Sequence, residues 1–438
     1  MIRRRIHRLL AAVAALAVAV GVLTGCAPAE DRLTLRLWDP QVAAAYRTSL
    51  AAFTRSTGIR VDVVVVPWAD YFTQLRADVA AGTVDDVFWT NATGFRAYAA
   101  AGAIRPVSAD QRSRQESTWQ PAVVRQYSAD GKLWGVPQIT DPGIGLLYNA
   151  QLLRAAGLTP DDIGRLSWDP AAADDPLRQA ARRLTLDDAG RHPGDAGFDA
   201  ARTAQYGFGA ADDLNAVLLQ FLAGNGAAWQ DGDRFVFASP EGRAALGYVV
   251  DLMNREQVAP SAADTDPPAG GSYLLDQFTQ GRLALFPTGA YNLANVRDGA
   301  RFDWGIAPLP RGPAGAISVT NGVILAASAR SPHRAEQQRL LDWLGSAAGQ
   351  AAIGRSGAAM PAVVSAQQDY LRSWRKRGVD VSPMLDVLAN GSIQAPQGSR
   401  YTAASDAMQP ILDDVFLGRR PVGSGLRAAQ DAANAAGG

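Results

Sequence analysis

"LTLRLWDPQVAAAYRTSLAAFTRSTGIRVDVVVV", residues 33–66, contains a helix pattern between two strand patterns. Residues 33–38 alternate apolar with other side chains, and residues 60–66 are rich in β-branched valine, as is typical of strands. Between them, apolar side chains recur at helical spacing and Gly58 follows as a helix end (Val42, Tyr46, Leu50 and Phe53). The stretch therefore predicts a strand, a helix and a second strand.

The residues that follow repeat this alternation. Apolar side chains at helical spacing after Pro67 predict a helix that ends at Gly82, and "DDVFWT", residues 85–90, predicts a third strand. A β-α-β-α-β order folds as a parallel sheet with right-handed crossovers, so we expect an α/β protein. In such sheets, small ligands bind beyond the carboxyl ends of the strands.

Aromatic and short polar residues follow the predicted strand ends: Trp38, Asp39, Trp68 and Asn91. Indole rings can pack on the apolar face of a sugar, and carboxylate and amide groups can bind its hydroxyls, so we predict that these residues bind a sugar. Two alternatives stay open, because Trp68 also lies on the apolar stripe of its helix, and Asp39 and Asn91 also suit caps and turns. "LWDPQVAA" lacks the glycines of a phosphate-binding loop, which argues against a dinucleotide site.

The N-terminus has the layout of an export signal. Four arginines precede an uncharged apolar run at residues 9–23, which is shorter than the roughly 20 residues of a membrane-spanning helix. "LTGC" ends at Cys26, the only cysteine, and resembles a bacterial lipobox. This resemblance implies a lipoprotein signal peptide over residues 1–25, a lipid on Cys26 and a tether over residues 26–32. We therefore expect a protein that is lipid-anchored to the cell membrane and faces the extracytoplasmic side; an anchor formed by the apolar run is the alternative.

Charge and length limit the possible functions. Without residues 1–25, which contain four arginines and no acid, 38 basic residues face 42 acidic ones, and this balance argues against nucleic acid as a partner. The remaining chain exceeds the usual size of one domain, which predicts two lobes or more.

"DGKLWGVP" at residues 130–137 and "YNA" at residues 148–150 carry a family resemblance. "DVFWTNATGFRAYAAAGAIRPV" precedes them, and "FTQGRLALFPTGAYNLANV" and "FDWGIAPLPRGP" come after them. In this order, the stretches resemble the extracellular solute-binding proteins of ATP-binding-cassette (ABC) transporters, specifically the family 1 carbohydrate binders related to maltose-binding protein.

The resemblance implies a two-lobe clamp of the type II periplasmic-binding-protein kind, in which each lobe is a mainly parallel sheet flanked by helices. Residues 138–143 and 305–310 resemble the segments that cross between the lobes. The implied division is 33–140 and 307–345 for the first lobe, and 141–306 and 346–430 for the second. Prolines and glycines in these crossings suit a hinge that lets the lobes close on a ligand.

The resemblance also implies further ligand-binding residues. "GAY" at residues 289–291 matches a family turn in which Tyr291 replaces the commoner tryptophan, and Asn292 follows it. Asp141 follows the extended strand of the first crossing, where the family often places a carboxylate or an amide, and Asn321 precedes a glycine in a turn that faces the ligand. We expect Asp141, Tyr291, Asn292 and Asn321 to contact the ligand.

Catalytic and metal-binding patterns are weak. His192 lies in a polar stretch at residues 187–203 that we expect to be a surface loop, and His333 with Glu336 lacks the remaining ligands of a metal site. Neighbouring acid pairs such as 212/213 do not define the two separated carboxylates of a glycosidase. We predict no enzyme activity, no cofactor and no metal.

The expected function is therefore capture of a mono- or oligosaccharide between the lobes and its delivery to an ABC permease, which a separate ATPase drives. We expect the binding protein to be a monomer. Two alternatives stay open: a binder of a non-sugar solute, such as a polyol, an amino acid, a peptide or a polyamine, and a secreted glycoside-processing enzyme.

Overall fold

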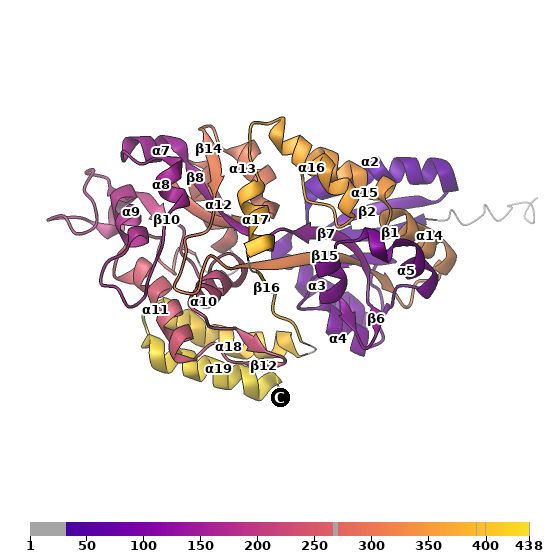
Figure 1. Ribbon diagram of the computed structural model, residues 1–438. Helices are drawn as coiled ribbons and strands as arrows, with labels where there is room; N and C mark the ends of the chain where they lie inside the picture. The colour runs from indigo at the N-terminus through magenta and orange to yellow at the C-terminus, as the bar shows by residue number, and fades with distance from the viewer. Residues whose placement is uncertain (1–31, 266–269, 391, 399, 438) are drawn as a thin grey trace, which may run out of the picture.

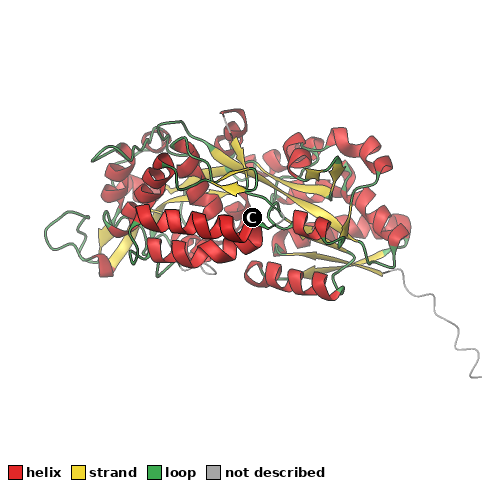
Figure 2. Cartoon of the chain, turned by 90° about the horizontal axis from the view of Figure 1, so that it is seen from below, coloured by secondary structure: helices red, strands yellow, loops and turns green. Residues whose placement is uncertain are grey.

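The computed structural model describes residues 32–265, 270–390, 392–398 and 400–437, so the predicted signal peptide, Cys26 and most of the tether lie outside the described residues. Two lobes stand side by side in Figure 1, the first on the right and the second on the left. Helices cover the sheets on their outer faces, as Figure 2 shows from below. Within the described ranges, no helix is long and apolar enough to cross a bilayer.

The first lobe is built on a sheet with the order β16-β15-β3-β1-β2, to which β4 and β7 add by pairing with β15. The strands are β1 (Arg32–Leu37), β2 (Arg60–Val65), β3 (Val87–Thr90), β4 (Ile104–Arg105), β7 (Val136–Asp141), β15 (Ser318–Ser328) and β16 (Ser392–Gln394). β1 runs parallel to β2 and β3, which confirms the predicted β-α-β-α-β unit, whereas β15 runs antiparallel to β3.

The helices of this lobe are α2 (Pro40–Thr57), α3 (Trp68–Ala81), α4 (Phe95–Ala100), α5 (Ala109–Gln115), α6 (Pro121–Gln126), α14 (Arg334–Leu344) and α15 (Ala347–Ser356). A short helix, η1 (Glu116–Thr118), and the hairpin β5 (Ser128–Ala129) and β6 (Lys132–Leu133) complete it. The side chain of Asp39 caps the N-terminus of α2, and the helix ends at Gly58, whose φ of 76° lies in the left-handed region. Its buried face includes all four of the apolar residues that predicted the helix.

The second lobe is built on a sheet with the order β14-β8-β13-β10-β9. The strands are β8 (Ile144–Asn149), β9 (Leu186–Asp187), β10 (Thr203–Phe208), β13 (Leu283–Gly289) and β14 (Trp304–Ala307). Only the β10–β13 pair of this sheet is parallel. The two-lobe α/β fold is thus confirmed, but this sheet is mixed rather than mainly parallel, because β8 enters from the first lobe and runs antiparallel to both of its neighbours.

The helices of the second lobe are α7 (Ala150–Ala155), α8 (Pro160–Gly164), α9 (Pro176–Leu184), α10 (Leu219–Gly224), α11 (Pro240–Asn254), α12 (Gly270–Thr279), α13 (Leu293–Gly299), α18 (Tyr401–Phe416) and α19 (Val422–Gly437). Shorter elements are η2 (Ala200–Arg202), the π-helix η3 (Leu214–Leu218), η4 (Ala290–Asn292) and the hairpin β11 (Gln230–Asp231) and β12 (Arg234–Phe235). α18 and α19 pack side by side at the C-terminus (Figure 1).

The chain crosses between the lobes at the predicted first segment. β7 belongs to the first sheet and β8 to the second, so Pro142 and Gly143 make the crossing. The return crossing lies beside it, because the Ile144 N–H donates to Ser318 Oγ at 2.8 Å. Gly143 has a φ of 123°, and a Cβ there would lie 3.0 Å from Ser318 Oγ, so both conformation and space favour glycine.

The structure divides the lobes differently from the implied ranges at two places. Residues 308–317 stay with the second lobe, where the Arg311 N–H donates to the carbonyl of Leu166. α15 packs on α2 in the first lobe, and Ser49 Oγ donates to the carbonyl of Gly349 at 2.6 Å. The small, buried face of α15 permits this close approach. α16 (Val364–Arg375) packs on α15, and α17 (Ser382–Asn390) leads back to the second lobe.

The polar stretch at residues 187–203 is more ordered than a plain surface loop. Asp187 pairs with Arg191 at 2.7 Å and accepts hydrogen bonds from the N–H groups of Ala189 and Asp199. β9 and β10 close the base of the loop.

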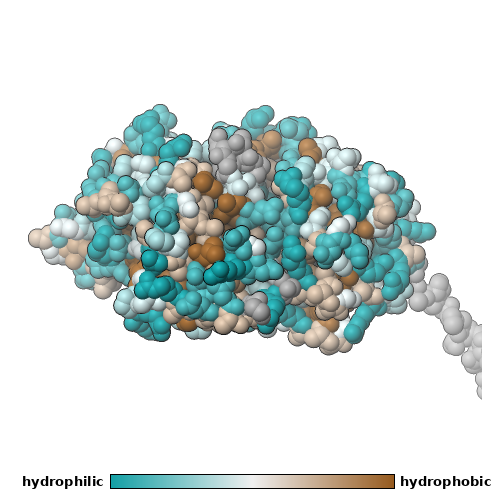
Figure 3. All heavy atoms as spheres, turned by 60° about the horizontal axis from the view of Figure 1, so that its bottom comes forward, coloured by the Kyte–Doolittle hydropathy of each residue, from teal (hydrophilic) through white to brown (hydrophobic). Residues whose placement is uncertain are grey.

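Most of the surface visible in Figure 3 is hydrophilic, with small apolar patches.

Candidate functional site

Trp38 and Trp68 lie at the carboxyl edge of the first sheet, as predicted. Trp38 packs edge-on against Trp68, Tyr71 and Trp89, with ring centroids 5.4, 5.0 and 4.8 Å apart. Trp68 is 56% exposed, whereas the buried side of its helix is formed by Tyr71 and Leu75. Trp38 therefore supports the cluster, and Trp68 presents an accessible indole.

Asp39 and Asn91 both perform the local roles that the sequence left open. Asp39 Oδ1 caps α2 by accepting the N–H groups of Gln41 and Val42 at 2.8 and 2.9 Å. Burial raises the pKa of the Asp39 carboxyl, although these two N–H groups oppose the rise. Asn91 Oδ1 accepts the Thr93 hydroxyl at 2.8 Å. Asp39 Oδ1 and Asn91 Oδ1 are thus engaged locally.

Asp141 ends β7 at the crossing between the lobes. Its Oδ1 accepts the N–H of Gly143 at 3.2 Å. Burial raises the pKa of the Asp141 carboxyl to about 7, although hydrogen bonds from the N–H groups of Gly143 and Ala290 oppose the rise. Ala290 belongs to η4 in the second lobe, so Asp141 links the hinge to the turn that carries Tyr291.

Tyr291 folds back over its own turn. A Cβ on Gly289 would lie 2.2 Å from Tyr291 Cε1, so the glycine of the "GAY" turn makes room for the ring. The side chain is 41% exposed, yet its surroundings are crowded, and this desolvation raises the pKa of Tyr291. The negative charges of Asp213 and Asp141 raise it further. Tyr291 thus follows Ala290, whose N–H donates to Asp141, in the same short helix η4.

Asn292 and Asn321 each have part of their hydrogen-bonding capacity occupied within the protein. Asn292 Nδ2 donates to Thr288 Oγ1 at 2.9 Å, and its Oδ1 accepts Asn295 Nδ2 at 3.2 Å. Asn321 faces Asp141 across the β15–β7 pair, and its Oδ1 accepts Gln126 Nε2 and the N–H of Gly322. These two amides are placed near the site but are held by neighbouring residues.

Asp213 is the residue that sequence reasoning missed. Its Oδ1 caps the π-helix η3 through the N–H groups of Asn215 and Ala216 at 3.0 and 2.9 Å. Burial raises the pKa of its carboxyl, against the effect of these N–H groups. An acidic residue before the apolar run at 216–219 is a helix-start signal, and an acid pair such as 212/213 is usually a helix start or a solvated face, so the sequence did not single out Asp213 as a ligand-binding residue. π-Helical turns are frequent at functional sites.

The arrangement can bind a polar ligand through carboxylates that have no ion-pair partner among the described residues. Asp141 and Asp213 supply hydrogen-bond acceptors, while Tyr291 and Trp68 supply accessible rings. Within the ranges that the structure describes, no group of three or more His, Cys, Asp or Glu side chains could hold a metal ion.

Comparison with solved structures places the chain among two-lobe binding proteins. UspC of M. tuberculosis is 45% identical with a TM-score of 0.73, and the similarity covers 92% of this chain and all of that one. A solute-binding protein of Thermotoga lettingae bound to α-D-tagatose is 20% identical with a TM-score of 0.78, over 93% of this chain and all of that one. An ABC substrate-binding protein of Listeria monocytogenes in complex with cycloalternan is 19% identical with a TM-score of 0.77, over 92% of this chain and 98% of that one.

No curated protein sequence matches the chain. A family model described as bacterial extracellular solute-binding protein matches residues 39–351, which is more than half of the chain. The extent of this match and the similarity to UspC agree with the two lobes and the hinge. The chain therefore belongs to the bacterial extracellular solute-binding protein family.

Proposed function

We propose that the chain is the extracytoplasmic substrate-binding component of an ABC importer and that it captures a mono- or oligosaccharide between its lobes. The single observation that carries the proposal is geometric: at the hinge Ala290, next to Tyr291, donates its N–H to Asp141 of the first lobe, and η3, which Asp213 caps, packs on β13. Sugar hydroxyls can donate to the two carboxylates while the apolar face of the sugar packs on the phenol ring.

The candidate ligand-binding residues come from both lobes. Trp68 stands at the edge of the first sheet, whereas Tyr291 and Asp213 belong to the second lobe. A ligand that contacts both sets of residues favours the closed arrangement of the lobes, which a permease can recognise. Relatives with the same fold that hold tagatose or cycloalternan support a carbohydrate as the ligand.

Isothermal titration calorimetry against a panel of mono- and oligosaccharides tests the proposal. We expect one class of sugar to bind with one site per chain, and amino acids, peptides and polyamines to give no heat. Binding of a non-sugar solute instead would replace the carbohydrate proposal with the alternative binder. Turnover of a chromogenic glycoside would indicate an enzyme, and we expect none.

Delivery to a permease needs the binding protein near the membrane, and the lipobox-like "LTGC" supports a lipid on Cys26. A tether raises the effective concentration of the loaded protein at the permease. Cys26→Ala should move the protein from the membrane fraction to the soluble fraction. Retention of the variant in the membrane fraction would mean that the apolar segment is the anchor. Light scattering of the soluble variant should give the mass of a monomer.

A further inference from the structure

A chain of side-chain hydrogen bonds joins the two lobes in addition to the crossing strands. Gln41 Nε2, on α2 of the first lobe, donates to Asn295 Oδ1 on α13 of the second lobe at 3.0 Å. Asn295 Nδ2 donates to Asn292 Oδ1 at 3.2 Å, and Asn292 Nδ2 donates to Thr288 Oγ1 at 2.9 Å. We call these four residues the amide relay.

Both ends of the amide relay are fixed next to candidate ligand-binding residues. In the first lobe, Asp39 Oδ1 accepts the main-chain N–H of Gln41, so the cap of α2 orients the residue that reaches across. In the second lobe, Asn292 directly follows Tyr291 in η4. A change in the position of Tyr291 therefore changes the position of Asn292.

We propose that Gln41 and Asn295 are positioning residues that latch the lobes in the closed arrangement and couple closure to occupancy of the site. The coupling to a sugar rests on the proposed function, whereas the latch itself does not. A ligand that packs on Tyr291 restricts η4, and the restricted turn holds Asn292 and Asn295 where Gln41 can donate. The Gln41–Asn295 contact exists only while the lobes are together, so it favours the closed state and not the fold of either lobe.

The chemistry of the amide relay suits reversible closure. The Gln41–Asn295 hydrogen bond joins neutral groups at the surface, so water can replace it when the lobes separate. Because neither group titrates or carries a charge, the latch should be insensitive to pH and salt. One such bond corresponds to a change of about five-fold in an equilibrium constant.

Single-molecule fluorescence transfer between the lobes measures the latch without any sugar. Labels at Thr48→Cys on α2 and Asp161→Cys on α8, in a chain with Cys26→Ser, report on the distance between the lobes; both positions are exposed. Gln41→Ala should lower the closed-to-open ratio about five-fold, and Asn295→Ala should do the same. The double variant should be no more open than either single variant, because both remove the same contact.

Gln151→Ala is the matched control. Gln151 follows the cap Asn149 of α7 by two residues, as Gln41 follows Asp39, but it lies on a helix of the second lobe. We expect no change in the closed-to-open ratio for this variant. An unchanged ratio in Gln41→Ala, effects of the two single variants that add, or a wild-type protein without a closed population would each overturn the latch. Failure of the chain to bind any sugar would contradict the proposed function but leave this result standing.

Discussion

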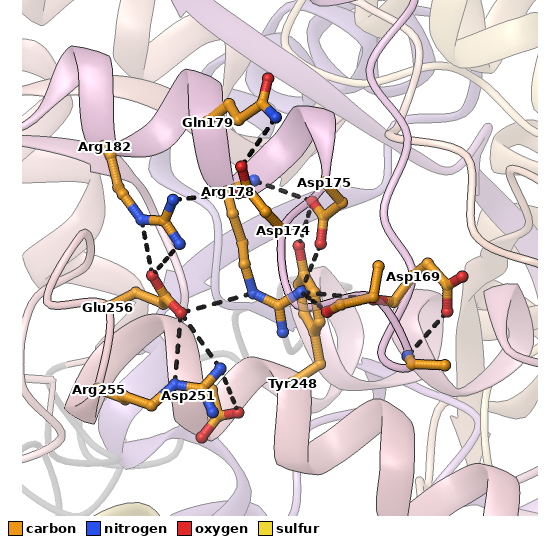
Figure 4. A network of polar contacts seen from close by, with 12 residues as sticks. Asp169, Asp174, Asp175, Arg178, Gln179, Arg182, Tyr248, Asp251, Arg255 and Glu256 are labelled. Carbon is orange, nitrogen blue, oxygen red and sulfur yellow. Dashed lines mark hydrogen bonds and ion pairs between the residues drawn. The ribbon is translucent and has the colours of Figure 1, made fainter.

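Two groups of charged side chains, one buried and one partly buried, differ in the partners that the protein gives them. In the second lobe, Arg178 on α9 is only 2% exposed and donates to Asp175 Oδ2 at 2.6 Å. Its guanidinium lies 4.1 Å from the centre of the Tyr248 ring, and Glu256 lies 3.6 Å from its Nε (Figure 4). Around the hinge, by contrast, Asp141 and Asp213 form no ion pair with any described residue and accept hydrogen bonds from the main chain.

We infer that the difference separates structural charges from candidate ligand-binding charges. The buried pair of Arg178 and Asp175 joins α9 to α11 through Tyr248, whose hydroxyl donates to Asp175 Oδ1 at 2.9 Å, so this carboxylate already has its partners within the protein. A carboxylate that is buried without a cation has a raised pKa and is costly to keep charged, so such groups are candidates for ligand binding. We expect the two groups to respond to substitution in opposite ways.

The largest expected effect is on the free energy of unfolding, when the buried ion pair of Arg178 is broken. Arg178→Ala leaves Asp175 without a cation in a buried place, although Glu256 keeps Arg182 at 2.6 Å, and should lower the free energy of unfolding by about 3–5 kcal/mol. Urea denaturation followed by circular dichroism measures the loss. Arg202→Ala, which breaks an exposed pair with Asp188, is the control and should cost less than about 1 kcal/mol. Equal losses in the two variants would show that burial does not distinguish them.

The second prediction concerns the unpaired group. Because the pKa of Asp141 is about 7 in the folded protein against 3.8 ordinarily, the folded state binds more protons between about pH 4 and pH 7. This contribution to the free energy of unfolding is therefore fully present below about pH 4 and is lost as the pH rises through about 7. Asp141→Asn removes the cost and should stabilise the protein by about 1 kcal/mol at pH 8, with no gain at pH 4.

The same variant should bind sugar at least about ten-fold more weakly, since a hydrogen bond to a charged acceptor is lost. Thermal unfolding at pH 4 and pH 8, combined with calorimetry, measures both effects. A variant that is less stable than the wild type at pH 8 would place Asp141 with the structural charges. Asp62 forms an exposed ion pair with Arg32, so Asp62→Asn is a control for the loss of a carboxylate at the surface.

The smallest expected effect is that of Tyr291, whose substitution tests the aromatic ring and not the carboxylates. Tyr291→Ala should weaken sugar binding by about 1 kcal/mol, which is about five-fold, because it removes the stacking surface. The free energy of unfolding should change by less than about 0.5 kcal/mol, since the side chain is 41% exposed. Tyr291→Phe keeps the ring and should retain most of the affinity. An unchanged dissociation constant in Tyr291→Ala would mean that the ring only packs on its own turn.

Local patterns in the sequence were sufficient for much of the fold. The stripe from Val42 to Phe53 and the stop at Gly58 correctly predicted α2, since helix periodicity and end signals are properties of neighbouring residues. The first crossing was predicted at residues 138–143, and the chain changes lobes at Pro142 and Gly143, the end of that range. The place of α15 could not be read in this way, because it depends on packing against α2, which is distant in the sequence.

The candidate site shows the same limit. The sequence identified Asp141 and Tyr291 through the family resemblance, but it could not show that neighbouring residues occupy the amides of Asn292 and Asn321. Asp213 was missed because its pattern is an ordinary helix cap, and only the fold brings its charge close to Tyr291. Hydrogen-bond partners and burial are set by tertiary structure, so a local pattern cannot decide between capping and ligand binding.

Calorimetry of one bound sugar with the wild-type protein and Asp141→Asn tests the central claim most directly. The account predicts a sugar that binds the wild type with one site per chain, and an affinity that falls at least about ten-fold in Asp141→Asn while the folded structure becomes no less stable at pH 8. Equal affinities of the two proteins for that sugar would contradict the claim that the unpaired carboxylate at the hinge is part of the binding site.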